Sequence, residues 1–328
     1  MSEWKLFHGS KERQVAPVLP PPPPPWRDFA KRRKAKEKGE DLRASRYVVR
    51  DEHIEIINAA ILLRRPLLVR GLPGTGKSSL AYAVAQELGW GPVLRWSVNS
   101  RTTLHEGLYH YDAIGRLQEL EAQARGGERL VEARAIDRFI RLGPLGTALL
   151  PSPHPRVLLI DEIDKADIDF PNDLLHVFEE GEFEIRELAR GTGRTENFRV
   201  MPHAGTIDSD AVEIPEGRVQ CTEFPFIIIT SNDEREMPPP FLRRCLPLKI
   251  EPPSMEELRR IVESHLGTQS LTELDSLLER FLDQRDTGRN VLAVDQLLNA
   301  VFLVADGRLP GAAERASLLA ALWSNLQG

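Results

Sequence analysis

The sequence has few cysteines and no long apolar run. Its only two cysteines, Cys221 and Cys245, lack the close spacing of a metal site, which favours a reducing, cytoplasmic setting. No apolar run approaches the length that spans a membrane, and the first residues lack the basic-then-apolar pattern of a secretion signal. We therefore expect a cytoplasmic protein with no membrane partner.

The chain also lacks an excess of positive charge. Its formal net charge of −6 argues against general nucleic-acid affinity, although it leaves room for a local basic patch. A length of 328 residues, 41% of them apolar, is enough for one large or two modest globular domains. No internal repeat is evident.

A glycine-rich loop is the most informative stretch that the chain does contain. Residues 71–78 fit the phosphate-binding pattern G-x-x-x-x-G-K-[ST], with Gly71, Pro73, Gly74, Thr75, Gly76, Lys77 and Ser78 as the nucleotide-binding candidates. The glycines let backbone N–H groups point at a phosphate, Lys77 can reach the β- and γ-phosphates, and the Ser78 hydroxyl can ligate Mg²⁺. A strand is expected over 66–70 and a helix after the loop, ended by Gly89. Because this arrangement places phosphate at a helix N-terminus, the sequence predicts a nucleotide-binding protein.

Two adjacent acids follow a second clear strand. Residues 157–160 are all apolar, as in a strand buried on both faces of a parallel sheet, and Asp161 and Glu162 come next. Asp161 suits Mg²⁺ binding alongside Ser78. Glu162 is then placed to orient or deprotonate a water that attacks the γ-phosphate, which predicts hydrolysis of ATP. Asp164 and Asp167 are expected to cap a helix N-terminus.

Polar residues after a third apolar strand give two further candidates. Asn232 follows the strand 226–230, where its amide could hold the attacking water; the alternative is an Asn that starts a loop. Arg243 and Arg244 follow three prolines and could project into a neighbouring subunit's phosphate site as an arginine finger, Arg244 being preferred. The alternative is a pair of solvated or salt-bridged arginines.

The two ends of the chain differ from its middle. Residues 1–45 contain six consecutive prolines and then a basic run without apolar periodicity, which predicts a disordered leader; a partner-docking segment is the alternative. Between the two ends, the pattern predicts a helix over 133–142 and a further helix that ends at Gly181. After Ser254 the pattern predicts a small helical bundle, with helices over 255–266, 271–281, 291–305 and 311–326.

Taken together, these motifs resemble those of the AAA+ ATPases. The matching segments, in chain order, are Gly71–Ser78, Leu158–Ala166, Ile229–Asn232 and Pro240–Arg244. They are similar to the Walker A, Walker B, sensor 1 and arginine-finger elements of that family. Within it, residues 58–69 and 107–113 resemble the MoxR branch.

The resemblance implies an α/β P-loop NTPase fold, in which helices flank a parallel sheet and a small all-α lid domain follows. It places the core at 46–251, with an insert at about 106–145 and a hairpin region at about 182–224, and the lid at 252–328. It further implies ATP and Mg²⁺ as cofactors, a homo-oligomeric ring, typically a hexamer, and a partner protein with a von Willebrand factor A domain. Arg289 is the candidate for sensor 2, although the family's Ser-Pro-Arg-like context is absent.

The favoured function is therefore a MoxR-type ATP hydrolase that remodels, assembles or activates a partner protein. A small-molecule P-loop kinase is an alternative, but it leaves Glu162, Asn232 and the C-terminal helices unexplained. A nucleotide switch that hydrolyses little, and a motor in a DNA-directed or defence system, are further alternatives. The presence of Glu162 argues against the nucleotide switch, and the acidic net charge argues against the DNA-directed motor.

Overall fold

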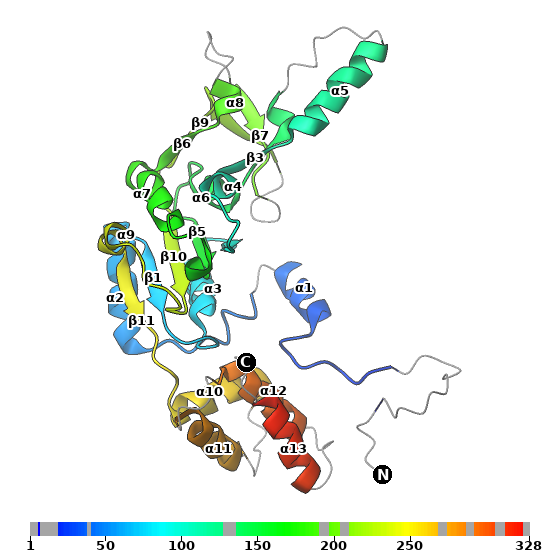
Figure 1. Ribbon diagram of the computed structural model, residues 1–328, viewed down its shortest axis with the longest axis vertical. Coiled ribbons are helices and arrows are strands. Elements are labelled where there is room, and N and C mark those ends of the chain that lie inside the picture. The colour runs from blue at the N-terminus through cyan, green and yellow to red at the C-terminus, as the bar shows by residue number, and fades with distance from the viewer. Residues whose placement is uncertain are drawn as a thin grey trace. The chain divides into compact units, whose positions relative to one another are not determined.

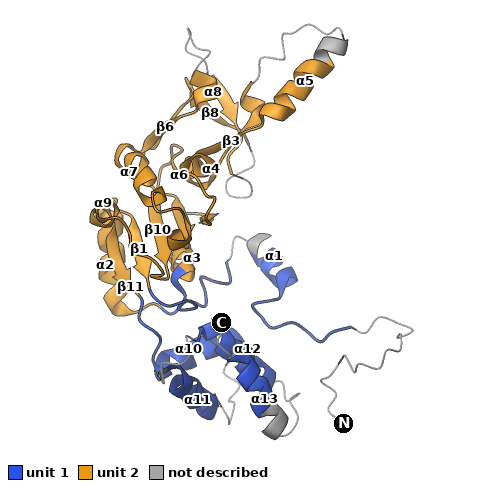
Figure 2. Cartoon of the chain, viewed as in Figure 1, with its two compact units in different colours: residues 1–48, 71–77, 250–328 blue, residues 49–70, 78–249 orange. Residues whose placement is uncertain are grey.

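The computed structural model describes residues 6, 19–37, 41–126, 136–189, 197–203, 210–267, 274–286, 292–305 and 312–323. It divides into two compact units (Figure 2). Unit 1 combines residues 1–48, 71–77 and 250–328, and unit 2 combines residues 49–70 and 78–249. The predicted domain boundaries at 45 and 251 remain predictions.

A five-stranded parallel sheet forms the centre of unit 2 (Figure 1). Its strands, in sheet order, are β11 (Leu246–Lys249), β1 (Leu67–Arg70), β10 (Phe226–Ser231), β5 (Val157–Asp161) and β2 (Leu94–Ser97). Every residue of β5 and β10 is buried, because these inner strands are apolar on both faces, whereas residues of the edge strand β2 alternate between buried and exposed. The strands expected over 66–70, 157–160 and 226–230 correspond to β1, β5 and β10, and the predicted α/β fold class is confirmed.

The helices next to the sheet strands are α2 (Asp51–Leu63), α3 (Lys77–Leu88), α7 (Phe170–Glu180) and α9 (Pro239–Arg244). Two of them, α3 and α7, end at the glycines that the sequence indicated. Gly89 after α3 and Gly181 after α7 have φ of +64° and +65°, the left-handed conformation that ends many helices.

The first of two excursions from the sheet lies between β2 and β5. It contains α4 (Leu104–Leu108), β3 (Tyr109–Tyr111), α5 (Ala113–Gly126), the 3₁₀ turn η1 (Ile136–Phe139), β4 (Ile140–Leu142) and α6 (Pro144–Ala148). Of the helix expected over 133–142, residues 136–139 form the 3₁₀ turn η1, but the prediction is wrong for residues 140–142, which form the strand β4, antiparallel to β3. Ile140 and Leu142 are buried and Arg141 is exposed, which is the period of two of a strand. Residues 127–135 lie outside the described residues.

The second excursion lies between α7 and β10 and consists mainly of antiparallel strands. Strand β6 (Glu182–Glu184) pairs with β9 (Arg218–Gln220), and β7 (Asn197–Val200) pairs with β8 (Val212–Pro215), while the short helix α8 (Arg186–Ala189) follows β6. Hairpins were expected at about 182–224, and the described residues of that region contain these two antiparallel pairs.

Unit 1 is mainly helical. Its helices are α1 (Phe29–Glu37), α10 (Met255–Leu266), α11 (Leu274–Asp286), α12 (Val294–Ala305) and α13 (Ala312–Leu322). Leu258, Leu278, Phe281 and Leu297 lie in a shared buried cluster of the last four helices, which the apolar periodicity predicted. Among the described residues, none of the helices of either unit is both long and apolar enough to cross a membrane.

The leader expected to be disordered is partly structured. Residues 29–37 form α1, and the Trp26 indole N–H donates a hydrogen bond of 3.2 Å to the Asn299 side-chain oxygen. The Trp26 ring also meets the rings of His265 and Phe302 edge-on, with centroids 6.0 and 5.8 Å away. A single tryptophan that packs on a distant apolar surface produces no local periodicity, so the sequence pattern did not reveal it. Residues 1–5, 7–18 and 38–40 of this leader lie outside the described part of the chain.

Candidate functional site

The glycine-rich loop, residues 71–77, connects β1 to α3. Gly74 and Gly76 have φ of +76° and +87°, which side-chain-bearing residues rarely adopt. Space also excludes a side chain at Gly74, where a Cβ would lie 2.5 Å from the Ala293 Cβ. A Cβ on Gly76 would lie 3.3 Å from the Tyr47 ring, a tight contact to which the ring would have to adjust. The two glycines are therefore required by the conformation of the loop.

The cation of the loop, Lys77, lies folded over its own backbone. Its side chain is buried, and its ammonium group donates hydrogen bonds of 2.8 Å to the carbonyl oxygens of Gly71 and Leu72. The Thr75 hydroxyl donates to the same Leu72 oxygen at 2.9 Å. Lys77 is also the first residue of the twelve-residue helix α3, whose first-turn N–H groups have no partner within the helix. A buried ammonium group at a positive helix N-terminus fits a phosphate group.

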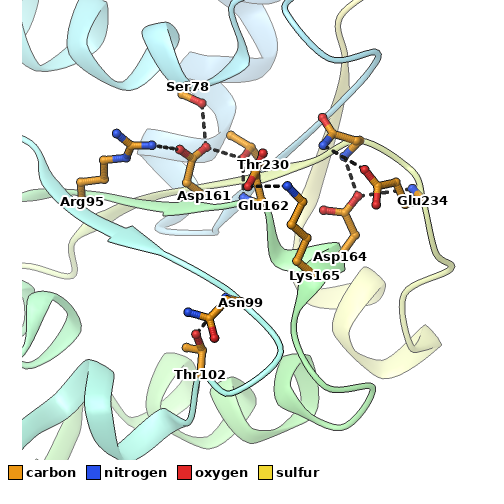
Figure 3. A network of polar contacts seen from close by, with 11 residues as sticks. Ser78, Arg95, Asn99, Thr102, Asp161, Glu162, Asp164, Lys165, Thr230 and Glu234 are labelled. Atoms are coloured by element: carbon orange, nitrogen blue, oxygen red, sulfur yellow. Dashed lines mark hydrogen bonds and ion pairs between the residues drawn. The ribbon is translucent and has the colours of Figure 1, made fainter. Parts of the chain in front are cut away.

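Asp161, the last residue of β5, is the centre of a buried polar network in unit 2 (Figure 3). Its Oδ1 accepts hydrogen bonds from the hydroxyls of Ser78, at 2.6 Å, and Thr230, at 2.8 Å, and its Oδ2 accepts one from the Arg95 guanidinium, at 2.7 Å. Burial by itself raises the pKa of Asp161. The hydrogen bonds from Ser78 and Thr230 and the charge of Arg95 outweigh burial and hold that pKa below its usual value. The carboxylate is therefore ionised at neutral pH. With the Ser78 hydroxyl, it offers the hard oxygen ligands that fit Mg²⁺.

Glu162 is the next residue, and its backbone and side chain point to different partners. It has a φ of +63°, unusual for a residue other than glycine, and its N–H donates a hydrogen bond of 2.9 Å to the Thr230 hydroxyl. Its carboxylate pairs with the Lys165 ammonium group at 2.8 Å, and 45% of its side chain is exposed. The hydrogen bond to Glu162 raises the pKa of Lys165. Glu162 thus presents a solvent-accessible carboxylate directly beside the Asp161 network.

Asp164 joins this region to Asn232. It is buried in the 3₁₀ turn η2 (Ile163–Lys165), and its Oδ2 accepts hydrogen bonds from the backbone N–H groups of Asn232, at 2.8 Å, and Glu234, at 3.3 Å. The Asn232 side-chain amide in turn approaches the Glu234 carboxylate at 3.4 Å. Asp164 therefore fixes the turn after β10, in which Asn232 is the first residue.

The expectation that Asp164 and Asp167 cap a helix is wrong. Helix α7 follows Asp169, whose side chain makes no capping hydrogen bond. Asp164 binds the distant turn at Asn232, and Asp167 accepts a hydrogen bond of 3.1 Å from the N–H of Asp169, within a turn before the helix. Both are turn-stabilising residues, which use the same acceptor chemistry as a helix cap.

The two candidate arginines at the end of α9 have different surroundings. Arg244 forms an ion pair with Glu179 of α7, whereas the Arg243 side chain is exposed. The guanidinium of Arg65 donates hydrogen bonds to the backbone oxygens of Arg243, Arg244 and Cys245 and so caps the C-terminus of this helix. The structure thus gives Arg244 a partner in its own chain. Arg289, the candidate for sensor 2, lies outside the described residues.

Sequence reasoning missed Arg95 and Thr230. Thr230 is the residue of β10 that follows Ile229, the partner of Ile160, and it therefore lies beside Asp161. Arg95 precedes Ser97, the residue of β2 opposite Asp161, by two positions. Both are polar residues within otherwise apolar strand segments. That they lie near Asp161 can be inferred only once β10 and β2 are known to flank β5.

A parallel sheet with a glycine loop after β1 and acids after β5 defines a P-loop nucleoside-triphosphatase fold. The family model for the "ATPase family associated with various cellular activities (AAA)" matches residues 67–253. The chain therefore belongs to the AAA family, whose members are ATPases that bind ATP, typically with Mg²⁺, and commonly oligomerise.

The chain also has a structural likeness to domain III of the replication initiation protein DnaA from Thermotoga maritima. The two share 18% sequence identity over 86% of this chain and 97% of that chain, with a TM-score of 0.41. No curated protein matches the sequence.

Proposed function

We propose that this chain is an ATP hydrolase of the MoxR type that acts as an oligomeric ring in the cytoplasm on a partner protein. The observation that best supports hydrolysis is the difference in environment between two adjacent carboxylates. Asp161 is buried and held by three donors, whereas Glu162 is half exposed and pairs with the half-exposed Lys165. The first suits a metal ligand and the second suits a base.

In this proposal each element of the site has one task. The loop and Lys77 bind the β- and γ-phosphates, while Ser78 and Asp161 hold Mg²⁺. Because Lys77 and Ser78 are neighbours in the chain, both sets of ligands serve one nucleotide. The bound Mg²⁺ supplies positive charge that stabilises the phosphates during transfer.

Glu162 acts on water. Its carboxylate leaves Lys165, accepts a proton from a water molecule and so aids attack on the γ-phosphate. Asn232, fixed by the Asp164 contact to its backbone, orients that water with its amide. The backbone hydrogen bond from Glu162 to Thr230 keeps the base in position relative to Asp161.

The proposed ring and partner are supported by the family resemblance and by the sequence position of Arg243 and Arg244, after the strand that ends before Asn232. Segments 58–69 and 107–113 resemble the MoxR branch, whose members act with proteins that carry a von Willebrand factor A domain, and we propose such a partner here. Arg243 and Arg244 are proposed to reach the nucleotide of a neighbouring subunit, and Arg289 to contact the nucleotide as sensor 2. If Arg244 is the finger, its ion pair with Glu179 must open in the assembled ring.

Hydrolysis is tested with two variants of different kinds. Glu162→Gln should bind ATP as the parent does but release phosphate at least about a hundredfold more slowly, the scale of general-base catalysis. Lys77→Ala should lose binding itself, because it deletes a cation from the phosphate site. Glu184→Gln, an exposed glutamate of β6, is the matched control and should behave like the parent. Parental turnover in Glu162→Gln would remove Glu162 from the mechanism.

The partner is tested with the same variant. Tagged Glu162→Gln protein in ATP should retain a bound partner that the Lys77→Ala protein does not. Mass spectrometry of the retained material should identify a protein with a von Willebrand factor A domain. A retained set without one would refute this part of the proposal and leave the hydrolase intact.

A further inference from the structure

The edge strand β2 supplies a charged residue that the proposed mechanism does not use. Along β2, Leu94 and Trp96 are buried, and Arg95 and Ser97 are exposed. Ser97 stands opposite Asp161 in the β2–β5 pairing, so Arg95 lies two residues earlier on the same side of the sheet. From there its guanidinium Nη2 reaches the Asp161 Oδ2 at 2.7 Å (Figure 3).

Arg95 is the charged member of the donor set around Asp161. Oδ1 accepts from two neutral hydroxyls, those of Ser78 and Thr230, whereas Oδ2 accepts from the guanidinium. The contact therefore balances the charge of a carboxylate that is mostly removed from water. A guanidinium that binds a carboxylate oxygen stands where a metal cation would otherwise bind the same oxygen.

The two partners of this ion pair differ in their freedom to move. The Asp161 side chain is 8% exposed and has three donors, so it is fixed at the end of β5. The Arg95 side chain is 50% exposed, so its own charge stays in contact with water when the guanidinium moves away from Asp161. When a second cation approaches Asp161, Arg95 is the group that gives way.

We propose that Arg95 is the internal counter-ion of Asp161 and competes with Mg²⁺ for this carboxylate. Without nucleotide it neutralises Asp161 and preserves the geometry of the network. On binding of the metal–nucleotide complex the guanidinium moves away, because two cations on one carboxylate repel each other. Arg95 thereby sets the Mg²⁺ concentration at which the site fills. The inference rests on the proposed nucleotide-binding function and adds to it a residue that controls metal dependence.

The test measures binding, without reference to turnover. Binding of the fluorescent nucleotide N-methylanthraniloyl-ADP to the full chain is titrated with Mg²⁺, starting from EDTA-treated buffer. For Arg95→Gln the half-saturating Mg²⁺ concentration should fall about fivefold to tenfold, the size expected for losing one charge-assisted hydrogen bond with a half-exposed donor. Binding in EDTA should stay at the parental level.

Three companion variants test whether the change in Mg²⁺ dependence comes from the charge of Arg95. Arg95→Lys keeps the charge and should stay close to the parent. Arg95→Met removes the charge with an unbranched side chain and should repeat the Arg95→Gln result, which guards against a folding defect of one variant. Arg218→Gln breaks another arginine–carboxylate pair of unit 2, with Glu182 at 3.0 Å, and should leave the Mg²⁺ dependence unchanged.

Two results would overturn the inference. The first is an unchanged half-saturating Mg²⁺ concentration in the charge-removing variants that bind nucleotide. The second is equally weakened binding with and without Mg²⁺, which would make Arg95 a phosphate ligand. Failure of the proposed function is a distinct result, because the parent itself would then bind no nucleotide at any Mg²⁺ concentration.

Discussion

Replacing Thr230 by valine should uncouple nucleotide binding from hydrolysis. Thr230 is buried in β10, and its hydroxyl bridges the two adjacent acids: it donates to the Asp161 Oδ1 at 2.8 Å and accepts from the Glu162 N–H at 2.9 Å. Valine has nearly the same shape and no hydroxyl. The substitution thus removes two hydrogen bonds and creates little empty space.

The two losses add to a moderate destabilisation. A hydrogen bond to a charged group contributes about 1.5–3 kcal/mol, and a buried N–H left without an acceptor costs about 1–3 kcal/mol. Asp161 keeps its donors Ser78 and Arg95, which favours the lower part of the summed range, so we expect the free energy of unfolding to fall by about 2.5–4 kcal/mol in Thr230→Val. Glu162 also holds a left-handed conformation that costs about 1–3 kcal/mol unless its surroundings maintain it. Without the Thr230 acceptor, its backbone should relax and move the carboxylate.

The assay compares Thr230→Val with Thr230→Ser, which keeps the hydroxyl and loses only a methyl group. Both variants are measured by thermal unfolding, by binding of N-methylanthraniloyl-ADP and by phosphate release from ATP. Thr230→Val should bind nucleotide within a few-fold of the parent and release phosphate at least about tenfold more slowly, the effect of displacing a catalytic group. Thr230→Ser should approach the parent in all three. Equal phosphate release by the two variants would refute the positioning role of the hydroxyl.

Two further predictions concern pH and assembly. Burial and, to a lesser extent, the charge of Arg46 lower the pKa of His265 from 6.5 to about 4, so the folded state favours the neutral ring and its stabilising effect is complete above pH 6.5. The free energy of unfolding should therefore fall as the pH drops from 6.5 toward 4, by up to about 1 kcal/mol per pH unit for this partly buried ring. His265→Gln should make the melting temperature less dependent on pH over that window. Equal dependence of the melting temperature on pH in the parent and in His265→Gln would contradict the prediction. Mixing inactive Arg244→Ala with inactive Lys77→Ala should restore phosphate release if the site is shared between subunits, with Arg243→Ala less impaired than Arg244→Ala. No recovery despite demonstrated subunit exchange would count against a shared site.

The parts of the fold that the sequence predicted are those with local signals. Residues 157–160 and 226–230 are continuous apolar runs, which occur in strands covered on both faces, and the observed β5 and β10 are fully buried. The phosphate-binding loop likewise depends on neighbouring residues, because Gly74 and Gly76 need conformations that glycine alone adopts readily. The roles of the site residues remain predictions.

What the sequence did not reveal depends on residues that are far apart along the chain. Asp164 is of a residue type that often caps helices, but it binds the backbone of a turn 68 residues later. No local sequence pattern distinguishes these two roles. Trp26 stands in a segment without apolar periodicity, and its partner Asn299 is 273 residues away. Ile140–Leu142 form a strand because β3 is available to pair with them, although their composition also suits a helix.

The environment of Asp161 shows why the site depends on the order of the strands. Its three donors come from separate elements: Ser78 from α3, Thr230 from β10 and Arg95 from β2. Strands β10 and β2 flank β5 on opposite sides, and each pairing register brings its donor to the end of β5. A shift of one residue in β2 would send Arg95 to the other face of the sheet and leave Ser78 and Thr230 where they are. The charge balance of the carboxylate is therefore set by the edge strand, whereas its position is set by the inner strands. Substitutions in β2 that weaken its pairing with β5 should accordingly change the metal dependence of the site before they change its fold.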